Sequence, residues 1–131
     1  MLLDTSGLVS LFDESDLLHQ SARVLYDAAT SRMTHSCVLA EFVPLCHARG
    51  LNRAATLAFL SGVLDSPDVE IVWVDESMHR SALELLQERP DKRYSLCDGV
   101  SFLLMRQRGI RESLTTDRHF EQEGFVRLLK P

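Results

Sequence analysis

Short strand-like segments alternate with helical segments along this sequence, and this alternation restricts the fold more than any other feature. The clearest strand-like segment is VEIVWV at 69–74, which is rich in β-branched residues and predicts a buried strand. Apolar residues at three- and four-residue spacing predict helices over residues 16–31, 37–50, 57–64, 78–86 and 95–109. Residues 112–129 predict a strand, a short helix and a second strand. Strands that alternate with helices form a parallel sheet covered by helices, so we predict an α/β fold.

The size of the chain indicates how many domains it forms, and its net charge excludes some classes of function. With 131 residues, 45% of them hydrophobic, and no repeat or linker, the chain can bury one core, so we expect a single domain over 1–131. The formal net charge of −5 argues against a protein that coats nucleic acid or an anionic membrane through bulk electrostatics. No segment approaches the roughly 20 apolar residues of a membrane helix, and none resembles a signal peptide. We therefore expect a soluble cytoplasmic protein.

The cysteines and one proline allow two local predictions. The three cysteines, Cys37, Cys46 and Cys97, are odd in number and show no CxxC spacing. We therefore expect small buried or half-buried side chains rather than disulfides or a zinc site. Pro44 lies inside the helical stripe of residues 37–50, and we expect it to kink that helix or to lie within its first turns.

The opening segment MLLDTSG places an aspartate directly after its apolar residues. Asp4 can be the N-cap of a helix, with Gly7 loosening the turn. It can instead end a buried strand, at the sheet edge where open α/β folds place their sites. One acid does not decide between these two interpretations.

Three further acids occupy comparable positions. Glu41 lies among apolar residues early in a predicted helix, Asp98 lies in the first turn of another, and Asp117 follows the strand-like ESLTT. Glu41 can be a solvated helix charge, and Asp117 can be the N-cap of the short helix RHFEQ. Ser95 and Asp98 nearly match a capping box. Together the four acids predict a cluster at one edge of the sheet.

Four converging carboxylates would repel one another strongly. Two carboxylates about 4 Å apart repel by about 4 kcal/mol at an effective dielectric of about 20, so a cluster of four needs cations to neutralise it. Oxygen ligands favour Mg²⁺ or Mn²⁺, and the sequence shows no His or Cys cluster for a softer metal. Such ions lower the pKa of bound water and stabilise phosphoryl oxygens, so the predicted reaction is phosphodiester hydrolysis.

Four segments of the chain together resemble the PIN-domain nucleases and, among them, the small VapC-like ribonuclease toxins of type II toxin–antitoxin pairs. The segments are LLDTSGLVSLFD at 2–13, VLAEFVPL at 38–45, SLCDGVSFLLMRQRGI at 95–110 and LTTDRHFEQEGF at 114–125. They occur in the order and spacing of that family and cover almost the whole chain. The resemblance implies a PIN-like three-layer α/β/α sandwich with a central parallel sheet.

The resemblance also implies roles for individual residues. The acids that would bind Mg²⁺ or Mn²⁺ and activate water for RNA cleavage are Asp4, Glu41, Asp98 and Asp117. Thr5, Ser6 and Thr115 match hydroxyl positions beside the site and are expected to orient carboxylates or water. The resemblance further implies a homodimer and an antitoxin partner, a segment of which lies in the active-site groove.

Basic residues are candidates for contacts to RNA phosphates. They are Arg49, Arg53, Lys92, Arg93, Arg106, Arg108 and Arg118. Most are expected on the solvated surface, and Arg106 and Arg108 also suit the end of a helix, where cations favour the dipole. Arg118 is our candidate for a phosphate contact. His119 can donate to phosphate, but a lone histidine beside a phenylalanine is more often a packing residue.

Three functions compete for this sequence. The four acids favour a metal-dependent endoribonuclease. A non-catalytic module of the same fold, which binds RNA or protein, gains support from the acidic net charge and the lack of a basic stripe. A phosphatase of the haloacid dehalogenase type, with Asp4 as nucleophile, would need a second aspartate at position 6, where this chain has Ser6. The sequence does not identify the RNA that a nuclease would cut.

Overall fold

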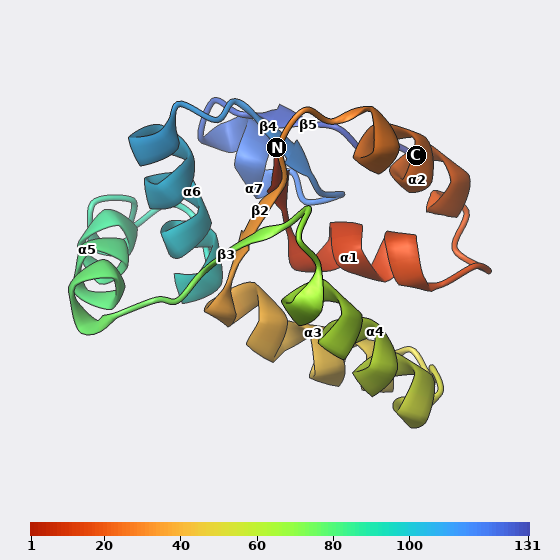
Figure 1. The fold of residues 1–131 in the computed structure, drawn as a ribbon. Helices are drawn as coiled ribbons and strands as arrows, with labels where there is room; N and C mark the ends of the chain where they lie inside the picture. The colour runs from red at the N-terminus through yellow and green to blue at the C-terminus, as the bar shows by residue number, and fades with distance from the viewer.

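A five-stranded parallel sheet forms the centre of the molecule (Figure 1). The computed structural model describes all residues from 1 to 131, and the strands lie in the order β3-β2-β1-β4-β5. The strands are β1 Leu2–Leu3, β2 Met33–His35, β3 Glu70–Val72, β4 Glu112–Leu114 and β5 Val126–Arg127. β1 is central, with Leu2 paired to Met33 of β2 and Leu3 paired to Leu114 of β4. The predicted α/β fold with a central parallel sheet is confirmed.

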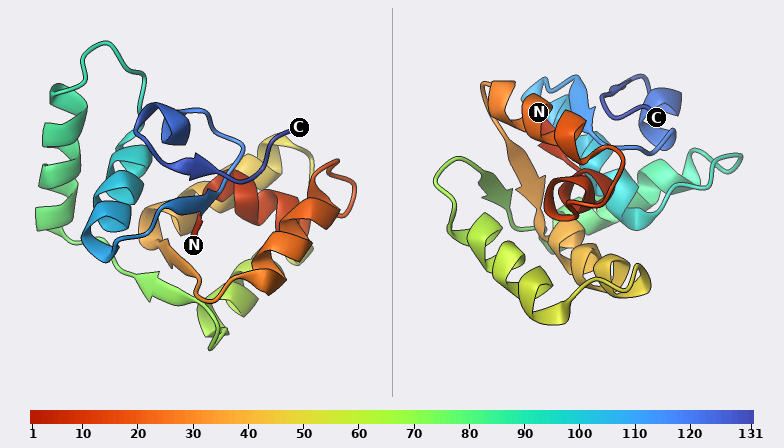
Figure 2. Two further views of the ribbon diagram at one scale, coloured as in Figure 1. Left: turned by 90° about the horizontal axis from the view of Figure 1, so that it is seen from above. Right: turned by 90° about the vertical axis from the view of Figure 1, so that its right-hand side faces the viewer.

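Seven helices cover the two faces of this sheet and make it a three-layer sandwich (Figure 2). They are α1 Thr5–Phe12, α2 His19–Ala28, α3 Ser36–Ala48, α4 Arg53–Asp65, α5 Glu76–Gln87, α6 Leu96–Arg108 and α7 His119–Gln122. The α5–α6 pair lies on one side of the sheet, and α1 to α4 lie on the other (Figures 1 and 2). All the predicted helices are present, although α2 is shorter than predicted. None is long and apolar enough to cross a membrane, and the longest have 13 residues.

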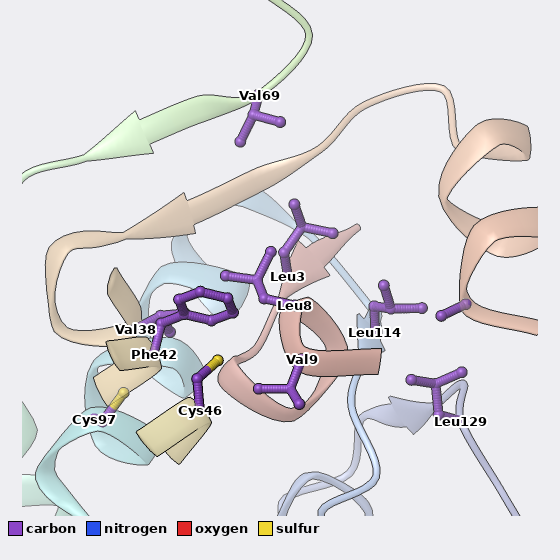
Figure 3. Close-up of a cluster of buried hydrophobic side chains, with 11 residues drawn as sticks. Leu3, Leu8, Val9, Val38, Phe42, Cys46, Val69, Cys97, Leu114 and Leu129 are labelled. Carbon is purple, nitrogen blue, oxygen red and sulfur yellow. The ribbon is translucent and has the colours of Figure 1, made fainter. Parts of the chain in front are cut away.

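Two apolar cores, one on each face of the sheet, explain why the first strand is continuously apolar. Successive residues of a strand point to opposite faces. Leu3 packs in the core formed with α1 to α4, and Figure 3 shows it together with Leu8 between Phe42 and Leu114. Leu2 packs in the other core, which includes Phe102 of α6. Both leucines are fully buried, so each contributes about 1.5–3 kcal/mol.

The strand predicted over 69–74 exists, but the prediction that it is buried is wrong. β3 lies at the edge of the sheet, where one side has no neighbouring strand. Glu70 is exposed, Ile71 and Val72 are half-buried, and Trp73 after the strand is 66% exposed. A run of β-branched residues therefore marks an edge strand here, whereas the central strand is only two residues long.

β2 is buried along its whole length, yet the sequence does not predict it as a strand. Two of its three residues, Thr34 and His35, are polar, and both are completely buried. Thr34 Oγ1 donates to the carbonyl oxygen of Leu3 at 2.9 Å, and His35 Nε2 lies 2.8 Å from Ser101 Oγ. These hydrogen bonds make polar residues acceptable in a buried strand.

The local expectations have separate outcomes. α3 continues as one helix through Pro44. This proline lies beyond the first two turns, so of the two expected positions only a kink of α3 at Pro44 stays a prediction. All three cysteines are free, with Cys46 and Cys97 buried and Cys37 half-buried. The prediction that the three cysteines are buried or half-buried side chains is confirmed.

Gly7 allows α1 to lie directly against the sheet. A Cβ atom at this position would lie 2.0 Å from the carbonyl oxygen of Leu114 and 2.8 Å from its carbonyl carbon. Both atoms belong to the backbone of β4, which pairs with β1 and cannot move freely. The glycine therefore fixes the close approach of α1 to the two strands that carry the polar residues described below.

Gly7→Ala is expected to lower the free energy of unfolding by about 3 kcal/mol, because the added methyl group overlaps a strand backbone. Gly62→Ala is the matched control: Gly62 lies in α4 with no atom within 4 Å of its added Cβ. That variant is expected to be more stable than the wild type by about 0.5–1 kcal/mol. Urea unfolding measures both values. Equal stability of Gly7→Ala and the wild type would contradict the close packing of α1.

Candidate metal centre

Four acidic side chains from separate parts of the chain line one pocket of about 460 Å³. Asp4 directly follows β1 and Asp117 follows β4, at the edge where the carboxyl ends of parallel strands meet. Glu41 lies on α3 and Asp98 on α6. The other lining residues are Thr5, Ser6, Leu45, Arg49, Arg93, Ser95, Thr116 and His119. The structure therefore places the four predicted acids around one pocket, and the group with ligand atoms within 4.8 Å of one another consists of Asp98, Asp117 and His119.

Asp4 combines the two positions that the sequence left open, since it ends β1 and occupies the N-cap position of α1. Its side chain makes no capping hydrogen bond. Instead it accepts a hydrogen bond from Thr115 Oγ1 at 2.7 Å and a longer one from Ser6 Oγ at 3.5 Å. Burial raises the pKa of Asp4 to about 7, an effect that the Thr115 bond opposes and the charges of Asp98 and Asp117 reinforce.

Asp98 belongs to a capping box and also faces the pocket. Ser95 Oγ accepts from the Asp98 N–H at 3.0 Å, and Asp98 Oδ2 accepts from the Ser95 N–H at 3.0 Å. The capping-box interpretation is confirmed. The same carboxylate oxygen lies 3.1 Å from His119 Nδ1. Burial raises the pKa of Asp98, the Ser95 amide opposes this shift, and Asp117 adds to it. The structural and functional explanations of Asp98 are therefore compatible.

Asp117 organises the turn between β4 and α7. The residue at the N-cap position of α7 is Arg118, so the prediction that Asp117 is the N-cap is wrong by one residue. Asp117 Oδ1 accepts from the His119 N–H at 2.9 Å, and the Asp117 N–H donates to Thr115 Oγ1 at 3.0 Å. Its other carboxylate oxygen, Oδ2, lies 3.4 Å from His119 Nδ1.

His119 lies in the pocket, although its place beside a phenylalanine favoured a packing role. Its Nδ1 is in contact with both Asp98 and Asp117. The ring also packs edge-on against Tyr94, with ring centres 5.2 Å apart, so the expected packing role describes only part of its environment. The one signal in the sequence was its place two residues after Asp117, in a turn that returns the side chain toward the acids.

Glu41 is the most exposed of the four acids. It lines the pocket from the exposed side of α3, so it is both a solvated helix charge and a member of the cluster. Burial raises the pKa of the Cys97 thiol, and the nearby Glu41 carboxylate raises it further. Glu41 therefore lies beside the first turn of α6.

The predicted hydroxyl residues surround the buried acid Asp4. Ser6 Oγ lies 3.2 Å from Thr115 Oγ1 and accepts from the Thr116 N–H at 3.0 Å. Thr5 also lines the pocket, and its Oγ1 is buried without any hydrogen-bond partner. An unpartnered buried polar atom costs about 1–3 kcal/mol. A hydrated cation among the carboxylates would offer such an atom a partner.

The donor atoms of the pocket suit a divalent cation. Ligand atoms of Asp98, Asp117 and His119 all lie within 4.8 Å of one another. Carboxylate oxygens with one imidazole nitrogen form a donor set that Mn²⁺ accepts and that Mg²⁺ accepts through its oxygens. The residues present therefore fit the metal that the acidic cluster implies.

Two of the predicted basic residues, Arg49 and Arg93, line the pocket with the acids. Arg118 is exposed at the N-cap of α7 and is not among the lining residues, so its contact with phosphate stays a prediction. Arg106 and Arg108 form ion pairs with glutamates instead. The positive charge beside the acids thus comes from Arg49, the C-cap residue of α3, and from Arg93 in the loop before α6.

The sequence also matches a known domain family. The model of the PIN domain matches residues 1–125, a range that contains all four acids. This chain belongs to the PIN-domain family. The predicted PIN-like three-layer sandwich is therefore confirmed, and the segments quoted above lie within the matched range.

Relatives within the PIN-domain family include a toxin of the VapC type. The chain is 31% identical over 127 residues to the 23S rRNA-specific endonuclease VapC20 of Mycobacterium tuberculosis, strains CDC 1551 / Oshkosh and H37Rv. The alignment covers 96% of this chain and 95% of the relative. The crystal structure of VapC20, described as a sarcin-ricin loop cleaving toxin, matches with a TM-score of 0.88 and 28% identity, covering 99% of this chain and 98% of that one. The resemblance to VapC-like toxins is confirmed.

Proposed function

We propose that residues 1–131 form a single PIN-like domain that acts as a metal-dependent endoribonuclease of the toxin type. The observation that carries the proposal is one pocket lined by Asp4, Glu41, Asp98 and Asp117. These carboxylates repel one another, and bound cations would neutralise that repulsion. The relative VapC20 is an endonuclease, which supports hydrolysis over the non-catalytic binding module.

In the proposed reaction the acids hold the cation, and neighbouring groups hold the acids. A divalent cation, when bound, lowers the pKa of water and stabilises phosphoryl oxygens. Thr115 Oγ1 donates to Asp4 and accepts from the Asp117 amide, so it fixes two of the acids relative to each other. Ser95 fixes Asp98 through the capping box. We propose that Arg93, at the pocket, and Arg118, outside it, contact phosphates of the RNA.

Cleavage of ribosomal RNA is the test of this function. Because VapC20 is described as cleaving the sarcin-ricin loop, we propose a hairpin of that loop as the first substrate, with a hairpin of scrambled loop sequence as control. The purified protein is expected to cut the first hairpin in the presence of Mg²⁺ or Mn²⁺ and to stop when a chelator is added. No metal-dependent cleavage of this hairpin or of total RNA would count against the proposal.

Added Mg²⁺ or Mn²⁺ is expected to raise the thermal unfolding temperature of the chelator-treated protein. A metal that binds only the folded state, at a concentration 100 times its dissociation constant, adds about 2.7 kcal/mol to the free energy of unfolding. This gain corresponds to a rise of roughly 10 °C in the unfolding temperature of a domain of this size. Asp98→Asn should show little of this shift. The same shift in Asp98→Asn and in the wild type would place the ion outside the proposed site.

The partners and the compartment belong to the same proposal. VapC20 is described as a toxin, and we propose that an antitoxin protein binds and inhibits this chain. We also propose a cytoplasmic homodimer. Trp73 and Leu83 are 66% and 50% exposed, and pairing would remove such apolar surface from water. A solution mass equal to one chain of 14.8 kDa would contradict the dimer.

A further inference from the structure

We propose that His119 is itself a metal ligand through Nδ1, acting together with Asp98 and Asp117. This part of the pocket is then a mixed nitrogen and oxygen site that favours Mn²⁺ over Mg²⁺. The inference rests on the proposed function, because it concerns the pocket to which that function is assigned. It changes the expected metal preference of the protein, since four carboxylates alone would form an all-oxygen site.

The three ligand atoms lie at separations that one ion requires. His119 Nδ1 is 3.1 Å from Asp98 Oδ2 and 3.4 Å from Asp117 Oδ2. Two ligands at about 2.1 Å from one ion, and at right angles to each other, lie about 3.0 Å apart. The observed separations are therefore close to those of neighbouring positions around one ion, and only small side-chain movements are needed.

Hydrogen bonds hold these groups in place, and the one that reaches the ligand atom Asp98 Oδ2 leaves that oxygen a further lone pair for an ion. The Ser95 N–H donates to Asp98 Oδ2, and the His119 N–H donates to Asp117 Oδ1. Asp117 Oδ2 therefore has the His119 ring as its neighbour and receives no backbone donor. The ring of His119 is held from the other side by its edge-on contact with buried Tyr94. Preorganised ligands of this kind lose little freedom when an ion binds.

Thr5 provides an observation that is independent of the acidic cluster. Thr5 lines the same pocket and is only 6% exposed, and its buried Oγ1 has no hydrogen-bond partner. Buried hydroxyl groups are nearly always satisfied by protein or water. A cation with its bound water molecules supplies the missing partner, and no protein group in the pocket does so.

The imidazole nitrogen decides the preference between the two metals. Mg²⁺ demands oxygen ligands and keeps several of its water molecules, whereas imidazole nitrogen suits transition-metal ions. Replacing His119 by glutamine keeps a polar side chain of similar length but removes the nitrogen ligand. His119→Gln is therefore expected to weaken Mn²⁺ binding at least about tenfold while changing Mg²⁺ binding by less than about threefold.

The decisive experiment detects the nitrogen directly. Mn²⁺ is added below stoichiometry to tag-free protein, and electron spin echo envelope modulation records whether a ¹⁴N nucleus of imidazole is coupled to the ion. The variants are His119→Gln and the control His47→Gln, whose histidine is exposed on α3 outside the pocket. Calorimetric titration with Mn²⁺ and with Mg²⁺ gives both affinities, and circular dichroism confirms that each variant is folded.

Imidazole modulation in the wild type and in His47→Gln, together with its loss in His119→Gln, would support the proposal. Bound Mn²⁺ without imidazole modulation in the wild type would overturn it, and His119 would then only orient the carboxylates. That outcome leaves the ribonuclease proposal intact, because RNA cleavage is measured separately. Absence of any Mn²⁺ binding, with or without RNA, would overturn both this inference and the metal-dependent function.

Discussion

Asp98→Asn is expected to reduce cleavage of the RNA hairpin at least about a hundredfold in the presence of Mg²⁺ or Mn²⁺. The change removes one negative charge from the proposed ion site, and even groups that only support metal ligands cost 10–100-fold when they are removed. Asparagine keeps a side-chain oxygen that can accept from the Ser95 N–H, so α6 can still begin at its capping box. Single-turnover rates measure the loss, and circular dichroism checks the fold.

Asp65→Asn is the matched control for this prediction. Asp65 is exposed at the end of α4 and does not line the pocket, so its variant should cleave within twofold of the wild-type rate. Asp4→Asn tests the same pocket at the end of β1, and this variant should lose RNA cleavage activity as Asp98→Asn does. If both variants are folded and cleave the RNA hairpin at the wild-type rate, the assignment of this pocket as the active site is wrong.

The metal-free protein is expected to lose stability as the pH rises from about 4 to about 7, with Asp4 as a main cause. Burial raises the pKa of Asp4 from its ordinary 3.8 to about 7 in the folded state. The folded protein therefore keeps this proton over a pH range in which the unfolded chain has released it. The stabilisation is fully present below about pH 4 and is lost as the pH rises through 7. A pKa shift of this size corresponds to about 4 kcal/mol in the free energy of unfolding.

Asp4→Asn isolates this effect, because asparagine does not titrate. In the presence of a chelator, the variant and the wild type should have similar free energies of unfolding near pH 4, and the variant should be the more stable by a few kcal/mol at pH 8. Urea unfolding at several pH values measures the difference. A difference that stays constant across this range would show that Asp4 has an ordinary pKa in the folded protein.

The strands show why periodicity predicts part of this fold and misses the rest. The pattern of β-branched residues found β3, but it could not tell an edge strand from a central one, because one sequence does not say which strands become neighbours. β2 escaped prediction because Thr34 and His35 look like surface residues until Leu3 and Ser101 are placed beside them. Polar residues in a buried strand depend on partners that are remote in sequence.

The candidate site was predicted better than the strands, because ends of parallel strands share one edge of the sheet. The order of the elements was enough to bring Asp4 and Asp117 into one pocket with the acids of α3 and α6. His119 was missed because the direction of its side chain depends on the turn made by Asp117. Arg93 could not be preferred over other arginines, because its place at the pocket depends on the path of the loop before α6.

The pairing of β1 with β4 has a consequence for the order of events during protein synthesis. Asp117 is made 113 residues after Asp4 (117 − 4), a delay of roughly 6–23 s at ordinary rates of translation. Until β4 emerges and pairs with β1, the first aspartate has neither Thr115 nor its fellow acids beside it. The pocket that holds the four acids is therefore assembled only late, after β4 at residues 112–114 has emerged and paired with β1.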